Sequence, residues 1–112
     1  MYNEERKRRF LDECEEKYSD EYLTSFRSLF NKTQTFEEMF GKDVADFSRE
    51  DISNFYAVAS YADAYTYSNI NARLGSYCAW CIEQALVIDG CNHFREFVLA
   101  DFNKYINLRL ER

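Results

Sequence analysis

Proline is absent from this 112-residue chain, and glycine occurs only three times, at Gly41, Gly75 and Gly90. Proline and glycine end helices, and together with Asn and Asp they form the tight turns of β-hairpins. A chain with so few of them has little to interrupt helices and few places for hairpin turns. We therefore predict an all-α fold, a compact bundle of five or six short helices.

The apolar content is high enough for that bundle to have its own core. Hydrophobic residues make up 46 % of the chain, among them ten Phe and nine Tyr. A chain of this length is usually one domain, so we expect residues 1–112 to form a single helical domain. No apolar run reaches the roughly 18 residues that span a membrane, and no signal-peptide pattern opens the chain. We expect a cytoplasmic protein whose four cysteines are reduced thiols.

Capping residues and apolar spacing predict three helices in the first part of the chain. The first covers about residues 3–18. Ser19 caps the second, which ends near residue 31. A capping box at residues 35–38 opens a short third helix, which stops at Gly41.

Three more helices are predicted in the rest of the chain. Ser48 opens the first of them with a second capping motif, Ser-Arg-Glu-Asp. The longest helix of the chain is expected over about residues 66–85. A turn at Asp89-Gly90 separates it from a last helix over about residues 99–110.

The only basic cluster is Arg6-Lys-Arg-Arg9, and carboxylates flank it on both sides. Oppositely charged side chains four residues apart pair on a helix surface. We interpret residues 6–9 as part of a solvated helix face. A nonspecific contact with phosphate is the alternative interpretation.

One segment departs from the acidic character of the chain. Acidic residues outnumber basic ones by 20 to 14, yet no carboxylate occurs from Ala64 to Ile82. Hydrogen-bond donors stand there instead, at the start of the predicted long helix, where backbone amides and the helix dipole favour anions. Such side chains bind phosphates and base edges. The predicted DNA contacts are Thr66, Tyr67, Ser68, Asn69, Asn71, Arg73 and Ser76, with Lys42 beside the Gly41 turn.

Two interpretations of this segment stay open. A helix that is buried on all sides also avoids carboxylates, although Asn69, Asn71 and Arg73 do not all fit a core. The net charge of −6 argues against a chain that coats nucleic acid, because phosphate contacts need Lys and Arg. The alternative function is therefore a small acidic protein–protein interaction domain with no nucleic-acid role.

Three segments together, residues 43–55, 66–81 and 86–92, resemble a known family in their order and spacing. The first is similar to an extended link that leads into a Ser-capped helix, here Ser48. The second reads Thr-Tyr-Ser-Asn-Ile-Asn-Ala-Arg-Leu and ends in an aromatic residue beside Cys81. The third is similar to a closing turn that reaches Asn92. The chain resembles the N-terminal SAM-like core-binding domain of phage-type integrases, which are tyrosine recombinases.

This resemblance implies a four- or five-helix bundle that clasps one face of the DNA at the crossover site. The implied partners are the double-stranded DNA of the attachment site, a separate catalytic domain and the other protomers of the recombination complex. It also implies a bacterial protein encoded by a prophage or mobile element.

No catalytic centre is predicted in this chain. Tyrosine recombinases use a Tyr nucleophile together with Arg, His and Lys groups that stabilise the transition state. The chain has a single His, His93, and no Arg-His-Arg-Tyr arrangement after it. We therefore predict that the chain is not an enzyme by itself and that it needs no cofactor.

Four soft side chains raise the alternative of a zinc site: Cys78, Cys81, Cys91 and His93. However, Cys78 and Cys81 fall in the middle of a predicted helix, on its apolar stripe. Buried cysteines behave as small hydrophobic residues. We therefore prefer a core position for this pair and predict no metal site.

Overall fold

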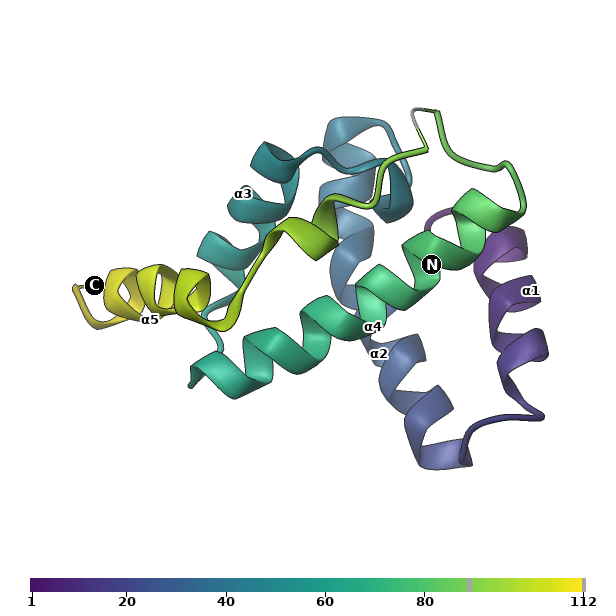
Figure 1. Ribbon diagram of the computed structural model, residues 1–112, viewed down its shortest axis with the longest axis horizontal. Coiled ribbons are helices and arrows are strands. Elements are labelled where there is room, and N and C mark those ends of the chain that lie inside the picture. The colour runs from purple at the N-terminus through teal and green to yellow at the C-terminus, as the bar shows by residue number, and fades with distance from the viewer. Residues whose placement is uncertain (89, 112) are drawn as a thin grey trace. The chain divides into compact units, whose positions relative to one another are not determined.

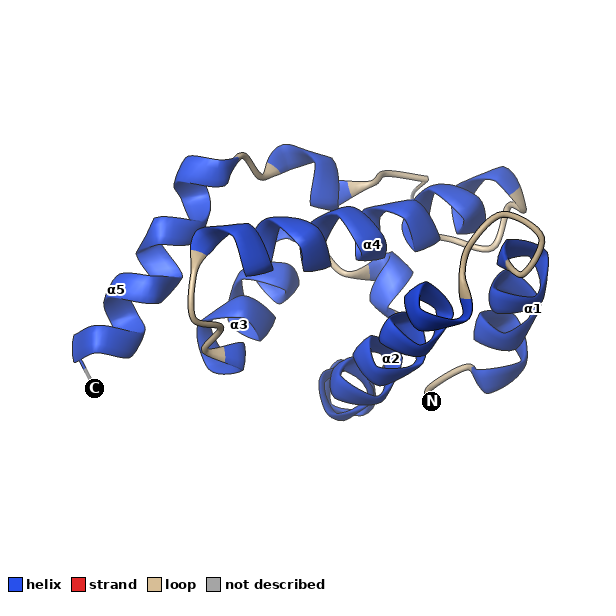
Figure 2. Cartoon of the chain, turned by 90° about the horizontal axis from the view of Figure 1, so that it is seen from below, coloured by secondary structure: helices blue, strands red, loops and turns tan. Residues whose placement is uncertain are grey.

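The computed structural model describes the backbone of residues 1–88 and 90–111 (Figure 1). Side chains are described through residue 107. Within these residues the chain forms five α-helices, three short 3-10 helices and no strand, so the predicted all-α fold is confirmed (Figure 2). No helix in this part of the chain is long and apolar enough to cross a membrane. Contacts divide the chain into two compact units, Met1–Val44 and Ala45–Arg112. The single domain remains a prediction.

The first unit is a pair of helices, α1 (Glu4–Cys14) and α2 (Asp20–Phe40), joined by aromatic packing. The ring of Phe10 lies 5.2 Å from that of Phe26 and 6.3 Å from that of Phe30, edge to face in both cases. Aromatic pairs favour this geometry, because the positive edge of one ring meets the negative face of another. These rings form the centre of the unit.

The ends of α2 are as predicted, but its middle is not. Ser19 accepts a hydrogen bond from a backbone N–H of the first turn, and Gly41 ends the helix at a φ of +68°, which glycine adopts without strain. The predicted break between residues 31 and 35 is wrong, because α2 is continuous. Thr33 is buried there and packs as a helix-interior residue. With 21 residues, α2 is also the longest helix described.

The second unit follows a 3-10 helix, η1 (Val44–Asp46), at the boundary. The capping box that starts its first α-helix is confirmed: Ser48 and Asp51 each accept a hydrogen bond from the backbone N–H of the other, at 3.1 Å and 2.9 Å. Its elements, in chain order, are α3 (Arg49–Ala59), α4 (Ala64–Glu83), η2 (His93–Glu96), η3 (Leu99–Phe102) and α5 (Asn103–Glu111).

Aromatic rings also form the core of the second unit. Tyr56 of α3 is completely buried, and four rings surround it at 5.5–5.8 Å, edge to face: Tyr67, Phe97, Phe102 and Tyr105. The four come from α4, α5, η3 and the residue after η2. This cluster therefore fixes α4 against the segment that follows it, where η2 and η3 lie beside α4 (Figure 1).

Candidate nucleic-acid interface

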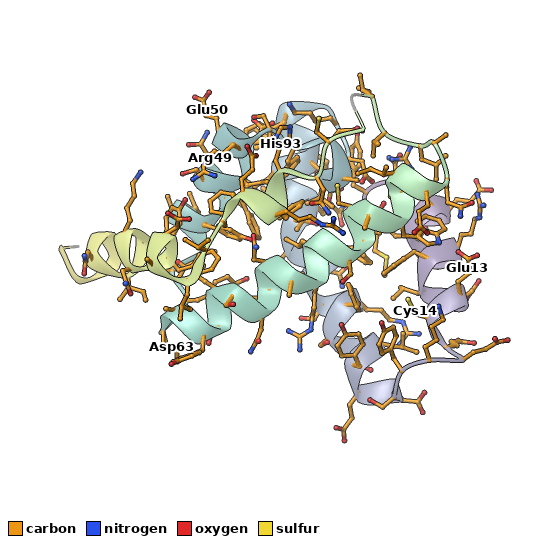
Figure 3. The ribbon with its side chains drawn as sticks, viewed as in Figure 1. Glu13, Cys14, Arg49, Glu50, Asp63 and His93 are labelled. Atoms are coloured by element: carbon orange, nitrogen blue, oxygen red, sulfur yellow. The ribbon has the colours of Figure 1, made fainter. Side chains whose placement is uncertain are left out.

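A carboxylate already caps the N-terminal end of α4. Helix α4 begins at Ala64, and Asp63 caps it by accepting hydrogen bonds from the backbone N–H and the hydroxyl of Thr66, at 2.8 Å and 3.0 Å (Figure 3). These hydrogen bonds lower the pKa of the Asp63 carboxyl, so it is charged at neutral pH. The predicted anion site at this helix end is therefore wrong, because an acidic side chain occupies it.

Two of the predicted DNA contacts point into the second unit. Tyr67 is completely buried, and its hydroxyl donates to the carbonyl oxygen of Tyr56 at 2.9 Å and accepts from the backbone N–H of Tyr61 at 3.2 Å. The prediction that Tyr67 contacts DNA is wrong, because no part of its side chain reaches the surface. Asn71 is half-buried, and both ends of its carboxamide make hydrogen bonds inside the unit.

Four other candidates lie together on the outer side of α4. Helical spacing of three and four residues places Asn69, Arg73 and Ser76 on one face, and Ser68 borders it. We call these four residues the α4 polar face. Asn69 and Ser76 are exposed, and Ser68 and Arg73 are partly exposed. The opposite side of α4 carries the buried residues Tyr67, Ile70, Leu74, Tyr77, Cys78 and Cys81. Helix α4 therefore has one buried side and one side at the surface.

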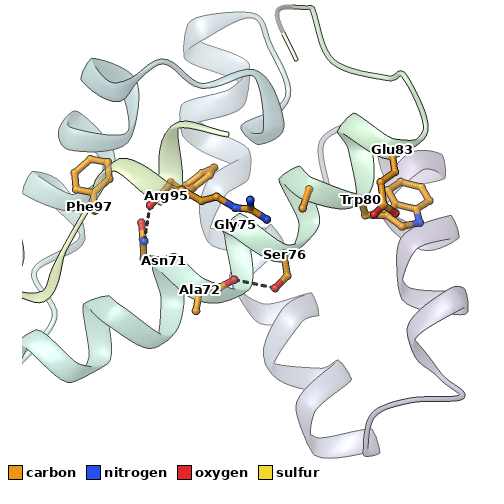
Figure 4. A pocket seen from close by; sticks show the side chains of 10 residues that line it. Asn71, Ala72, Gly75, Ser76, Trp80, Glu83, Arg95 and Phe97 are labelled. Atoms are coloured by element: carbon orange, nitrogen blue, oxygen red, sulfur yellow. Dashed lines mark hydrogen bonds between the residues drawn. The ribbon is translucent and has the colours of Figure 1, made fainter. Parts of the chain in front are cut away.

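A groove of about 450 Å³ runs beside this face, between α4 and η2 (Figure 4). Gly75 lines it, and a Cβ at this position would lie 3.4 Å from Cβ of Phe94, so the two backbones approach closely here. Ser76 and Arg95 also line the groove. Arg95 is exposed, and among the described residues no hydrogen bond or ion pair engages its guanidinium. Sequence analysis missed Arg95, because only the packing of η2 on α4 brings it here.

Lys42 lies in the first unit, directly after Gly41, whereas the other candidates lie in the second. It is partly exposed. Its contact with DNA stays a prediction.

The first unit contains a buried charge cluster that sequence analysis also missed. Lys7 is completely buried, with its ammonium 2.6 Å from a carboxylate oxygen of Glu37 and 2.8 Å from one of Asp43. Glu37 also accepts hydrogen bonds from the Thr33 hydroxyl at 2.5 Å and from the backbone N–H of Val44 at 2.9 Å. Burial raises the pKa of the Glu37 carboxyl, and the ammonium of Lys7 opposes that rise.

This cluster corrects the interpretation of residues 6–9 as a solvated face. Arg8 does make the predicted surface pair, with Glu4 at 3.1 Å. Lys7, however, continues the buried stripe of Phe10, Leu11 and Cys14 at helical spacing. That spacing was the signal in the sequence that could have placed Lys7 inside.

The cysteines of α4 lie in the core, as predicted. Cys78 and Cys81 are both buried, and the Cys78 thiol donates to the carbonyl oxygen of Ala45 at 3.3 Å. Cys91 is exposed. Across residues 1–88 and 90–111, no three His, Cys, Asp or Glu side chains are grouped so that they could hold a metal ion.

Comparison with known proteins gives one match. Residues 1–83 match the family described as "MrpR, N-terminal core-binding domain". The match ends at the last residue of α4, so it includes the whole α4 polar face. No curated protein and no solved structure matches the chain. The chain belongs to the family of MrpR N-terminal core-binding domains.

Proposed function

We propose that this chain is the DNA-binding core-binding domain of a tyrosine recombinase of the phage integrase type. In this role it holds one face of the duplex at the recombination site, while a catalytic domain elsewhere in the parent protein exchanges the strands. Membership of a core-binding domain family supports the first part of this proposal. The resemblance of residues 43–55, 66–81 and 86–92 to integrases supports the second.

The observation that carries the proposal is the charge around the α4 polar face. Arg73 lies ten residues after Asp63 and ten before Glu83, the carboxylates nearest to it along the helix. At 1.5 Å per residue each lies about 15 Å away along the axis. That exceeds the Debye length of about 8 Å at physiological salt. In a chain of net charge −6, this face can approach a phosphate backbone without strong repulsion from its own helix.

The contacts on this face would come from side chains, because Asp63 occupies the amides of the first turn. Arg73 would supply a charge-assisted hydrogen bond to a phosphate or to guanine. Asn69 would add a neutral hydrogen bond to the phosphate backbone. Ser76 would add another once its hydroxyl turns from the carbonyl oxygen of Ala72, to which it now donates at 3.0 Å. Arg95, across the groove from Ser76, offers a second guanidinium.

Few cations are involved, so we expect the isolated chain to bind DNA weakly. Counterion release scales with the number of phosphates that Lys and Arg neutralise. In the parent protein, a tether to a second DNA-binding domain would raise the effective concentration and compensate for this weakness.

One observation favours the alternative, a protein–protein interaction domain. Tyr65 is 71 % exposed in the first turn of α4, and Ile88 is 87 % exposed beyond its end. Exposed apolar side chains of this size are common at protein interfaces. Such a domain would show no salt-dependent affinity for DNA.

Fluorescence anisotropy with a labelled duplex of mixed sequence, repeated over a series of salt concentrations, tests the proposal. We expect measurable binding at low salt, with log K falling linearly against log salt at about 0.9 per phosphate contacted. Ser76→Asp should abolish this binding, because it places a carboxylate on the α4 polar face, one turn from Arg73.

Ser28→Asp is the matched control. Ser28 is exposed in the middle of α2, so the same charge is added to a helix surface in the first unit. We expect it to leave most of the binding intact. If the unmodified chain shows no binding at low salt, the proposal is wrong. Equal effects of the two substitutions would remove α4 from the interface.

A further inference from the structure

We infer that Asn71 is a positioning residue: its carboxamide sets the place of Arg95 beside the α4 polar face. This inference rests on the proposed DNA-binding function and adds a cation to its contact surface. It also assigns a role to Asn71, whose side chain does not face outward as a direct contact would require.

The carboxamide of Asn71 links the aromatic core to the residue before Arg95. Its Nδ2 donates to the carbonyl oxygen of Phe94 at 2.8 Å. Its Oδ1 accepts from the hydroxyl of Tyr56 at 2.7 Å. The Tyr56 ring is completely buried among other rings, so its hydroxyl is held in place. Both hydrogen bonds together fix the orientation of the amide and, through it, the backbone at Phe94.

A second amide anchors the same segment from its other end. Nδ2 of Asn92 donates to the carbonyl oxygen of Gly75, one turn along α4 from Asn71, at 2.9 Å. The backbone N–H of Arg95 in turn bonds to the carbonyl oxygen of Asn92 at 3.2 Å. With four residues, η2 is too short to be stable alone. Its position therefore depends on tertiary contacts, which are the buried Phe94 side chain and the hydrogen bonds of Asn71 and Asn92.

Arg95 depends on this anchoring more than Arg49 does. Arg49 donates to the carbonyl oxygen of Glu96 at 3.0 Å and lies 4.5 Å from the Phe97 ring, so its own contacts hold it. No such contact holds the Arg95 side chain within the described residues. The backbone at Arg95 sets the region that its guanidinium can reach, across the groove from Ser76 (Figure 4). Fixing that backbone before binding leaves only the side-chain rotation to be lost when the guanidinium meets a phosphate.

A double-mutant cycle on DNA binding tests this inference. Arg95→Ala should weaken binding at low salt about tenfold, as expected for one charge-assisted hydrogen bond, and lower the salt slope by about 0.9. Asn71→Ala should also weaken binding and lower the salt slope, although it removes no charge. In the Arg95→Ala background, Asn71→Ala should change the affinity by less than about twofold, the usual error of additivity.

A merely structural role would not reduce the salt slope, and its effect would persist when Arg95 is absent. Tyr56→Phe provides a second variant, because it keeps the bond to Phe94 and removes only the one to Oδ1. We expect it to shift the slope in the same direction by a smaller amount, and it decides the matter if Asn71→Ala does not fold. The inference is wrong if Asn71→Ala and Tyr56→Phe bind DNA with the affinity and salt slope of the unmodified chain. It is also wrong if Asn71→Ala weakens binding just as much when Arg95 is already replaced by Ala. Absence of DNA binding by the unmodified chain would instead refute the proposed function.

Discussion

Two cations, one in each unit, have opposite environments. In residues 1–44, the ammonium of Lys7 is completely buried and two carboxylates, Glu37 and Asp43, lie within 2.8 Å of it. In residues 45–112, Arg95 is exposed beside the α4 polar face, in a groove that Glu83 also lines. A buried charge is tolerated only when partners replace its hydration, whereas an exposed one keeps its water until a ligand arrives. The comparison separates a charge that maintains the fold from a charge that is available to a ligand.

The first way to test this comparison is to remove the buried cation. Lys7→Ala leaves Glu37 and Asp43 buried without their ammonium partner. We expect the free energy of unfolding to fall by about 3–5 kcal/mol, the usual cost of breaking a buried ion pair from one side. Urea denaturation followed by circular dichroism measures this free energy. Complete loss of the cooperative unfolding transition would agree with a loss at the upper end of this range.

Arg8→Ala is the matched control for Lys7→Ala. Its side chain belongs to the same basic cluster and pairs with Glu4, but both partners are exposed. We expect a loss of no more than about 1 kcal/mol. Similar losses of unfolding free energy in the two variants would mean that the buried ion pairs of Lys7 stabilise the fold no more than the exposed pair of Arg8.

The second test removes the central cation of the α4 polar face. Arg73→Ala should weaken DNA binding and lower the salt slope by about 0.9, because one phosphate contact is lost. Arg73→Lys keeps the charge but not the planar guanidinium, so it should retain the slope while losing part of the affinity. Anisotropy titrations over a salt series distinguish these results. An unchanged slope in Arg73→Ala would remove Arg73 from the contact surface.

Local signals in the sequence were enough to predict the fold class and several helix ends. Ser19, Ser48 and Gly41 act where they were predicted, because caps depend on neighbouring residues only. The break predicted at residues 31–35 failed because a capping box in the sequence can also lie inside a helix. There, the buried bond between Thr33 and Glu37 favours continuation.

The candidate site was predicted only in part, because hydrogen-bond donors in a sequence do not show which side of the helix is buried. Tyr67 shares its stripe with Ile70 and Leu74, and this spacing places it inside. Asp63 stands one residue before the carboxylate-free segment, where it acts as a cap. Arg95 could not be assigned from the sequence, because its place depends on the packing of a four-residue helix on α4.

The smallest effect is expected at Asp63, the acidic residue that caps the N-terminal end of α4. Asp63→Asn keeps a capping oxygen for the backbone N–H of Thr66 but removes the negative charge from the helix N-terminus. We expect DNA affinity at low salt to rise by about two- to fivefold, the range for one charge at an exposed helix end. Asp20→Asn, the same change in the first turn of α2, is the control and should have less effect. An equal gain in both would indicate that only net charge matters, and weaker binding by Asp63→Asn would mean that DNA does not approach α4 from this end.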